Sequence, residues 1–229
     1  MRYKLLLADA DGTLFDFDEG KRLALITVFE NFGLPTDDEA VCLFTKINET
    51  HWKRLELGQT TQSRLGVERF VDFLKALDKQ GNPEALSKAF ITELGNQRIL
   101  IPGAERFCRR MSERMPIYLV TNGIAAVQRS RVAGSDIEPF VSGLIISEEI
   151  GCAKPNPEMI FAAMKMAGTA ERRDVILLGD SITADIGAAR SAGIDSILFL
   201  NGKTIPMGHG ATFVAKSYTE AEEYIFANE

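Results

Sequence analysis

The chain has 229 residues, which is enough for one sizeable hydrophobic core or for a domain that carries an insertion. Hydrophobic residues make up 45% of it and charged residues 25%, as is ordinary for a globular protein. The formal net charge of −6 argues against a general binder of nucleic acid polymers or of anionic membranes.

The three cysteines, Cys42, Cys108 and Cys152, are widely spaced and lack any C-x-x-C pattern. This spacing predicts neither a disulfide framework nor a zinc site, and it favours a reducing, cytoplasmic environment. No run approaches the roughly 20 apolar residues that a membrane span needs. The N-terminus also lacks a basic region followed by a long apolar one, so we expect neither a signal peptide nor a membrane anchor.

A first strand is predicted at residues 3–8, an apolar run of the length typical of a buried parallel strand. Asp9 and Asp11 follow it, two residues apart, and Gly12 comes next. Because Gly12 favours a loop, we expect both acids at the C-terminal edge of the sheet, where open α/β sheets bind ligands. Two carboxylates this close repel unless a cation lies between them or one is protonated. A plain acidic turn after a strand has the same pattern.

Helical periodicity dominates the next part of the chain, after an acidic, turn-like stretch at residues 16–20. The predicted helices cover residues 21–32, 39–57, 61–77 and 83–94. About 80 residues of helix without a strand exceed what a crossover between parallel strands needs. We therefore predict a core domain of residues 1–16 and 96–229, interrupted by a helical domain at residues 17–95.

The next apolar run, residues 116–120, predicts a buried strand that ends in Thr121, Asn122 and Gly123. A hydroxyl and two backbone N–H groups close to the start of a helix suit a bound phosphoryl group. The same three residues also end many strands as an ordinary turn.

Two later apolar runs, residues 144–147 and 175–178, predict strands that lead to further charged side chains. Lys154 follows the first, in a stretch stiffened by prolines, where a surface lysine with free rotamers is an odd choice. Asp180 and Asp185 follow the second and suit a metal ion. An exposed loop lysine and an acid that caps a helix fit the same residues. Other predicted elements are helices at residues 105–114, 158–167 and 186–192 and strands at 196–200 and 212–215.

The chain resembles the haloacid dehalogenase-like hydrolase superfamily in four motifs, which occur in the family's order. They are D-A-D-G-T-L at residues 9–14, T-N-G at 121–123, K-P at 154–155 and G-D-x-x-x-x-D at 179–185. The resemblance implies an α/β fold, in which a Rossmann-like, doubly wound parallel sheet carries an inserted helical cap over residues 17–95.

The resemblance also implies roles for the residues of the four motifs. Asp9 would be the nucleophile that forms an aspartyl-phosphate, and Asp11 the acid and base that protonates the leaving oxygen and then activates water. Thr121 and Lys154 would bind and neutralise the phosphoryl group.

The cofactor implied is Mg²⁺. Its ligands would be Asp9, Asp180 and the backbone carbonyl of Asp11, with Asp185 holding the ion directly or through water. The backbone N–H groups of Asn122 and Gly123 would bind the substrate, a small phosphorylated metabolite.

Polar, aromatic and basic side chains gather at residues 48–54, within the implied cap. Trp52, Asn48 or His51 is a candidate for recognising the leaving group. If the substrate is a nucleotide, Trp52, Phe15 and Phe17 are candidates for stacking on its base. Alternatively, Trp52 is a packing residue of the cap whose indole N–H finds a local partner.

Asp11 narrows the activity that the resemblance implies. Haloacid dehalogenases of this fold carry no acid at that position, so a phosphatase or a hexose-phosphate mutase is indicated. D-A-D-G-T-L-F-D-F-D, T-N-G, I-S-E-E-I-G-C-A-K-P-N and L-L-G-D-S together resemble the bacterial pyrimidine 5′-nucleotidase branch. A nucleoside monophosphate is the substrate this implies, and a sugar phosphate or another small metabolite is the alternative. A non-catalytic protein that binds a phosphorylated ligand is a further interpretation, which the complete set of motifs disfavours.

Overall fold

The computed structural model describes residues 2–56, 59–169, 171–204 and 207–227. The chain divides into two compact units, Met1–Asp18 with Arg98–Glu229 and Glu19–Gln97. Among the described residues, the strands of the sheet lie in the first unit and the second unit is built from helices. None of the helices described is both long and apolar enough to cross a membrane.

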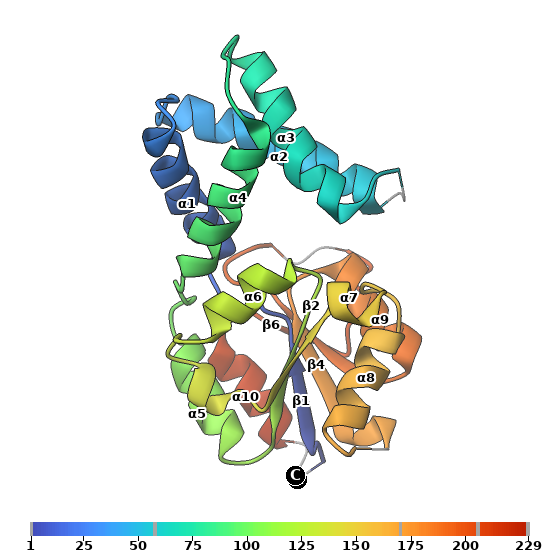
Figure 1. The fold of residues 1–229 in the computed structure, drawn as a ribbon. Helices are drawn as coiled ribbons and strands as arrows, with labels where there is room; N and C mark the ends of the chain where they lie inside the picture. Colours follow the sequence, from blue (N-terminus) through green and yellow to red (C-terminus); the bar gives the residue numbers. More distant parts are fainter. Residues whose placement is uncertain (1, 57–58, 170, 205–206, 228–229) are drawn as a thin grey trace. The chain divides into compact units, whose positions relative to one another are not determined.

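A six-stranded parallel sheet forms the centre of the first unit (Figure 1). Its strands are β1 (Leu5–Ala8), β2 (Ile117–Thr121), β3 (Gly143–Ile146), β4 (Val175–Gly179), β5 (Asp195–Phe199) and β6 (Phe213–Ala215). The spatial order is β3-β2-β1-β4-β5-β6, so the chain winds outward in both directions from β1 and β4. The doubly wound α/β fold predicted from the sequence is confirmed.

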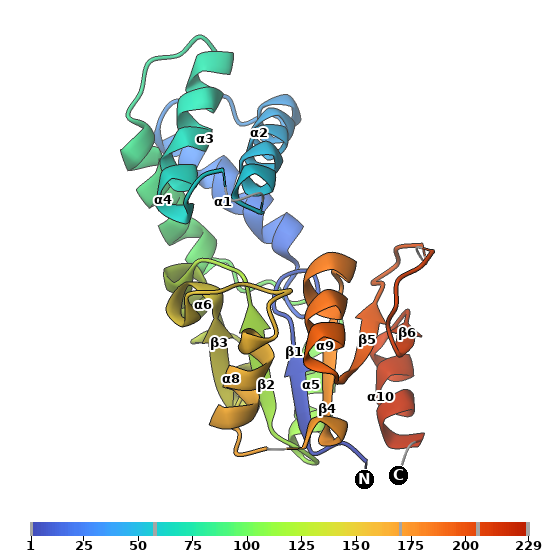
Figure 2. The same cartoon turned by 90° about the vertical axis from the view of Figure 1, so that its right-hand side faces the viewer.

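Helices cover both faces of this sheet, α5 and α10 on one and α8 and α9 on the other (Figures 1 and 2). The helices of the unit are α5 (Ala104–Ser112), α6 (Ala125–Val132), α7 (Ser147–Ile150), α8 (Glu158–Met166), α9 (Gly187–Ala192) and α10 (Tyr218–Ala227). Short helical turns are η1 (Glu138–Phe140), η2 (Arg172–Asp174) and η3 (Ile182–Ile186).

The central strand β1 is apolar throughout because both of its faces are buried. Leu6 and Ala8 belong to the core that α5 and α10 cover, whereas Leu5 and Leu7 belong to the core under α8 and α9. Side chains alternate between the two faces of a strand, so a strand covered on both sides needs a continuous apolar run. That run ends at Ala8, and the next residue, Asp9, lies at the C-terminal edge of the sheet.

The second unit contains the helices predicted between the first two strands. They are α1 (Phe17–Asn31), whose first two residues belong to the first unit, α2 (Asp38–Glu56), α3 (Gln62–Ala76) and α4 (Pro83–Asn96). The prediction of helix 39–57 is confirmed as far as Glu56, because Leu57 lies outside the described residues.

The predicted turn at residues 16–20 is wrong over most of its length, because α1 already begins at Phe17. Asp18 and Glu19 occupy its first turn, where acids interact favourably with the positive end of the helix dipole. Gly20 does not end the helix. A Cβ atom at this position would lie 3.2 Å from the Cβ of Gln97, so a close approach of chain segments explains the glycine.

Phenylalanine rings form the core of the helical unit, and Phe44 lies at their centre. Its ring centroid is 4.8 Å from that of Phe70, 5.4 Å from Phe73 and 5.6 Å from Phe90. A fourth ring, Phe29, lies 6.0 Å away in an edge-on arrangement. Phe44 is fully buried, so its removal leaves a cavity surrounded by rings that cannot all close in.

We expect Phe44→Ala to lower the free energy of unfolding of the helical unit by about 3–5 kcal/mol, the cost typical of a deleted core phenylalanine. Phe32→Ala, at a side chain that is 40% exposed, is the matched control. Its effect should stay within about 0.5 kcal/mol. Urea unfolding followed by circular dichroism measures both, and equal effects of the two variants would contradict this description of the core.

Candidate active site

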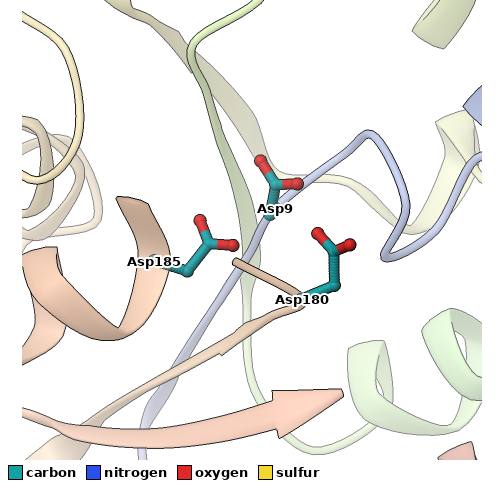
Figure 3. Close-up of side chains that lie close together, drawn as sticks. All are labelled: Asp9, Asp180 and Asp185. Carbon is teal, nitrogen blue, oxygen red and sulfur yellow. The ribbon is translucent and has the colours of Figure 1, made fainter. Parts of the chain in front are cut away.

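Three acids lie together at the C-terminal edge of the sheet (Figure 3). Asp9 follows β1, Asp180 follows β4, and Asp185 belongs to η3, the helical turn after β4. Each offers one carboxylate oxygen, and these three oxygens lie within 4.8 Å of one another. The strand order turns at β1 and β4, and such switch points are where open α/β sheets bind ligands.

Two glycines allow this close approach of the acids. Gly12 has φ +81°, and a Cβ atom there would lie 2.7 Å from Asp180 Oδ2. A Cβ atom at Gly179 would lie 2.5 Å from the Cβ of Asp185. Side chains at these positions would therefore push the carboxylates out of the cluster.

Lys154 is the cation at the centre of the cluster, and it is only 5% exposed. Its Nζ donates to Asp9 Oδ1 at 2.5 Å, to Asp185 Oδ1 at 2.6 Å and to the carbonyl oxygen of Val120 at 2.6 Å. The three donors of the ammonium group are thus all used. The exposed loop lysine that the sequence also allowed is excluded by this burial.

Asn122 holds the backbone of Lys154 in place. Its Oδ1 accepts from the Lys154 N–H at 2.8 Å, and its Nδ2 donates to the Lys154 carbonyl oxygen at 2.9 Å. Next to it, the N–H of Gly123 donates to Thr121 Oγ1 at 3.0 Å. The end of β2 therefore both positions the lysine and brings a buried hydroxyl to the edge of the sheet.

Burial and charge compete in this cluster. Burial raises the pKa of Asp9, and the negative charges of Asp185 and Asp11 raise it further. The positive charge of Lys154 offsets only part of this rise. Burial lowers the pKa of Lys154, but the carboxylates of Asp185 and Asp9 outweigh it, and the net shift is upward. Burial also raises the pKa of Asp180, against the charge of Lys203. The site holds its lysine charged and would be more stable with further positive charge.

Lys203 supplies some of that charge from the loop after β5. Its Nζ lies 2.8 Å from Asp180 Oδ2, and its side chain is 63% exposed. When all three acids of the cluster are ionised, Lys154 and Lys203 offset two of their three negative charges. Lys203 was not predicted as a site residue, because its only signal in the sequence is its position shortly after a strand that ends at the same sheet edge.

The donor set fits a magnesium ion. Mg²⁺ binds oxygen ligands and is commonly held by one or two carboxylates, with water and phosphate oxygens in the remaining positions. Asp9, Asp180 and Asp185 provide such oxygens, and their mutual repulsion falls when a divalent cation binds.

Asp11, the second acid of the first motif, is bound by two side chains of α6. Gln128 Nε2 donates to Asp11 Oδ2 at 2.7 Å, and Arg131 Nη2 donates to Asp11 Oδ1. Both α6 residues are buried. Neither residue was predicted from the sequence, although the two stand three residues apart on the helix that follows the T-N-G motif.

The candidates for leaving-group recognition lie on α2, in the helical unit. Asn48 Oδ1 accepts from Arg69 Nη1 at 2.8 Å, and His51 Nε2 lies 2.9 Å from Asp72 Oδ2. Both are buried and engaged within their own unit, whereas Trp52 is half-buried. Phe15 is fully buried, which does not suit stacking on a base. Recognition by Trp52 or Phe17 stays a prediction.

Known proteins share both the sequence pattern and the fold. The family profile of the haloacid dehalogenase-like hydrolases matches residues 3–193. Pyrimidine 5′-nucleotidase PynA of Streptococcus pneumoniae is 30% identical over 200 residues, 87% of this chain and 84% of PynA. Pyrimidine 5′-nucleotidase YjjG of Escherichia coli is 28% identical over 227 residues, 98% of this chain and 99% of YjjG.

A solved structure shows the same relationship. The crystal structure of the HAD-hydrolase YfnB from Bacillus subtilis, bound to magnesium, matches with a TM-score of 0.88 at 27% identity. The match covers 99% of this chain and 100% of the YfnB chain. The profile match spans more than four-fifths of the chain and contains every residue of the three-acid cluster and Lys154. The chain belongs to the haloacid dehalogenase-like hydrolase family.

Proposed function

We propose that this protein is a Mg²⁺-dependent phosphatase that hydrolyses small phosphomonoesters. The observation that carries the proposal is the pairing of a three-acid cation site with a further acid, Asp11, two residues after Asp9. A halide leaves without a proton, so a dehalogenase needs no acid there. An alkoxide is a poor leaving group, so a phosphate ester of an alcohol needs a proton on its ester oxygen, and Asp11 can supply it.

Positioning and charge neutralisation are the main demands of phosphoryl transfer. Lys154 keeps the Asp9 carboxylate oriented through a bond of 2.5 Å and offers positive charge to the phosphoryl oxygens. Thr121 brings its hydroxyl to the same edge of the sheet. When bound among Asp9, Asp180 and Asp185, Mg²⁺ supplies the charge that offsets repulsion between the nucleophile and the phosphate dianion.

The reaction follows from these placements in two displacements. A carboxylate oxygen of Asp9 attacks phosphorus and forms an aspartyl-phosphate, while the bond between phosphorus and the ester oxygen breaks. Asp11 enters this step protonated and gives its proton to that ester oxygen. As a carboxylate it then takes a proton from the attacking water. The second attack breaks the bond between phosphorus and Asp9. Inorganic phosphate and an alcohol leave, and both acids return to their first state.

Nucleoside 5′-monophosphates are the proposed substrates. Support comes from PynA and YjjG, both named pyrimidine 5′-nucleotidases, which match this chain over most of its length. We further propose that residues 1–16 and 96–229 act as the catalytic core and residues 17–95 as a cap that carries Trp52. A hexose-phosphate mutase and a phosphatase for sugar phosphates or other small metabolites are the alternatives.

Phosphate release from a panel of substrates tests the activity. We expect release from nucleoside 5′-monophosphates with Mg²⁺ and a loss of about 100-fold or more when the metal is chelated, because the cluster then keeps its excess negative charge. Glucose 1-phosphate and glyceraldehyde 3-phosphate complete the panel. Isomerised glucose phosphate without free phosphate would instead indicate the mutase, and no release from any member would remove the phosphatase proposal.

Asp9→Asn tests the nucleophile. The variant keeps the shape of the side chain but loses the attacking carboxylate, so we expect kcat to fall by about 1,000-fold or more. Acid-quenched reactions with ³²P-labelled substrate should trap labelled protein for the parent chain and none for the variant. Asp136→Asn, at an exposed acid far along the sequence, is the control and should retain activity. A labelled Asp9→Asn protein would show that another residue is the nucleophile.

Gly12→Ala tests the packing of the cation site. The new Cβ atom would lie 2.7 Å from Asp180 Oδ2, so we expect the Mg²⁺ concentration for half-maximal activity to rise about tenfold. Gly33→Ala is a matched control, because Gly33 also has positive φ (+66°), but among the described residues a Cβ atom there would meet nothing within 4 Å beyond its chain neighbours. Both variants carry backbone strain, and only Gly12→Ala should change the metal requirement.

A further inference from the structure

Two side chains of α6 donate hydrogen bonds to the two oxygens of the Asp11 carboxylate. Gln128 Nε2 donates to Oδ2 at 2.7 Å, and Arg131 Nη2 donates to Oδ1. Arg131 Nη2 also lies 3.2 Å from Gln128 Oε1, so the two α6 side chains are bound to each other as well. The three groups form a closed network in which each one fixes the other two.

This network is built into the interior of the first unit. Gln128 and Arg131 are each only 1% exposed. The guanidinium of Arg131 lies over the ring of Phe15, 4.7 Å from its centroid, and 5.8 Å from the ring centroid of Phe17. Burying a guanidinium is costly unless it is paired and hydrogen-bonded. The carboxylate of Asp11, whose side chain is 25% exposed, pairs with it at the border between the interior and the site.

Gly123 makes the approach of Gln128 possible. A Cβ atom at this position would lie 2.9 Å from both Cγ and Cδ of Gln128, too close for carbon atoms that are not bonded. Because the T-N-G motif ends in a glycine, the Gln128 side chain has room to pass this residue and reach Asp11. The end of β2 contributes to this network as well as to the placement of Lys154.

We propose that Gln128 and Arg131 are positioning residues that set the orientation of Asp11 for proton transfer. The inference rests on the proposed phosphatase function, in which the Asp11 carboxyl gives a proton to the ester oxygen as its bond to phosphorus breaks. It then takes a proton from the water that breaks the bond between phosphorus and Asp9. Proton transfer needs hydrogen-bond reach at both steps, and misplacement by about 1 Å can cost about 100-fold in rate.

The choice of leaving group separates this role from a purely structural one. An alkyl phosphate, such as a nucleoside 5′-monophosphate, needs a proton on its leaving oxygen, whereas p-nitrophenolate leaves without one. A misplaced Asp11 should therefore slow the first displacement only for the alkyl substrate. The second displacement is the same for both substrates and should slow for both.

The test is rapid-quench kinetics of the full-length protein with Mg²⁺ and the two substrates. For Arg131→Met we expect first-turnover cleavage of the alkyl phosphate to slow about 100-fold and KM to change less than about threefold. With p-nitrophenyl phosphate, we expect a first-turnover burst equal to the number of active sites, within about threefold of the parent rate, followed by slow turnover. Gln128→Leu should show the same pattern with a loss of about tenfold, and Arg131→Lys should recover part of the loss.

Arg129→Met is the matched control on the same helix. Arg129 is exposed and pairs with Glu149 rather than with Asp11, so its kinetics should equal those of the parent chain. If Arg131→Met does not fold, Gln128→Leu carries the test. Equal losses of the first-turnover rate with both substrates, or no loss with either, would overturn the positioning role. A parent chain that cleaves neither substrate would instead show that the proposed function itself is wrong.

Discussion

The repulsion among buried carboxylates is the constraint on which this site depends. Asp9 and Asp185 are nearly inaccessible to solvent, and Asp180 lies within reach of both. Acids in such a setting would be protonated or pushed apart without compensating charge. Lys154 provides that charge from the centre, with bonds to two of the three acids. Removing one partner from a buried ion pair is strongly destabilising, so the cluster holds together as a unit.

The balance of charge in the three-acid cluster also prepares the site for a phosphate group. When the three acids are ionised, Lys154 and the exposed Lys203 leave one of their negative charges without a partner. A divalent cation reverses that sign and leaves a site that attracts a phosphate dianion. The doubly wound sheet brings these charged side chains together at the C-terminal ends of β1 and β4, where the strand order reverses. Glycines at positions 12 and 179 contribute the space in which carboxylates can meet.

Much of this arrangement could be predicted from the sequence, because strands buried on both faces leave a clear signal. The apolar runs that end at Ala8, Thr121 and Gly179 are strands whose C-terminal ends meet at one edge. The acids that directly follow two of these strands, Asp9 and Asp180, then indicated a cation site at that edge. Helix positions in the second unit followed from periodicity, apart from the start of α1, where an acidic first turn resembles a loop in sequence.

Contacts between side chains that are distant in the sequence could not be predicted from these patterns. In the sequence, Arg131 looks like one more charge on a short helix, and its burial against Phe15 appears only when α6 packs against the rest of the first unit. Lys203 meets Asp180 because β5 lies next to β4, a neighbour relation that no local pattern encodes. For Gly123 the sequence suggested a role only for the backbone N–H group, and it gave no sign that the missing side chain leaves room for Gln128. Each of these depends on which segments become neighbours.

The most direct measurement is a crystal structure of the protein with Mg²⁺, beryllium and fluoride, in which beryllium trifluoride takes the place of a phosphoryl group on a carboxylate. We expect beryllium bonded to a carboxylate oxygen of Asp9 and a cation held among Asp9, Asp180 and Asp185, with Lys154 still in contact with Asp9. Beryllium on another residue, or a cation bound elsewhere while Asp9 stays unmodified, would contradict the account.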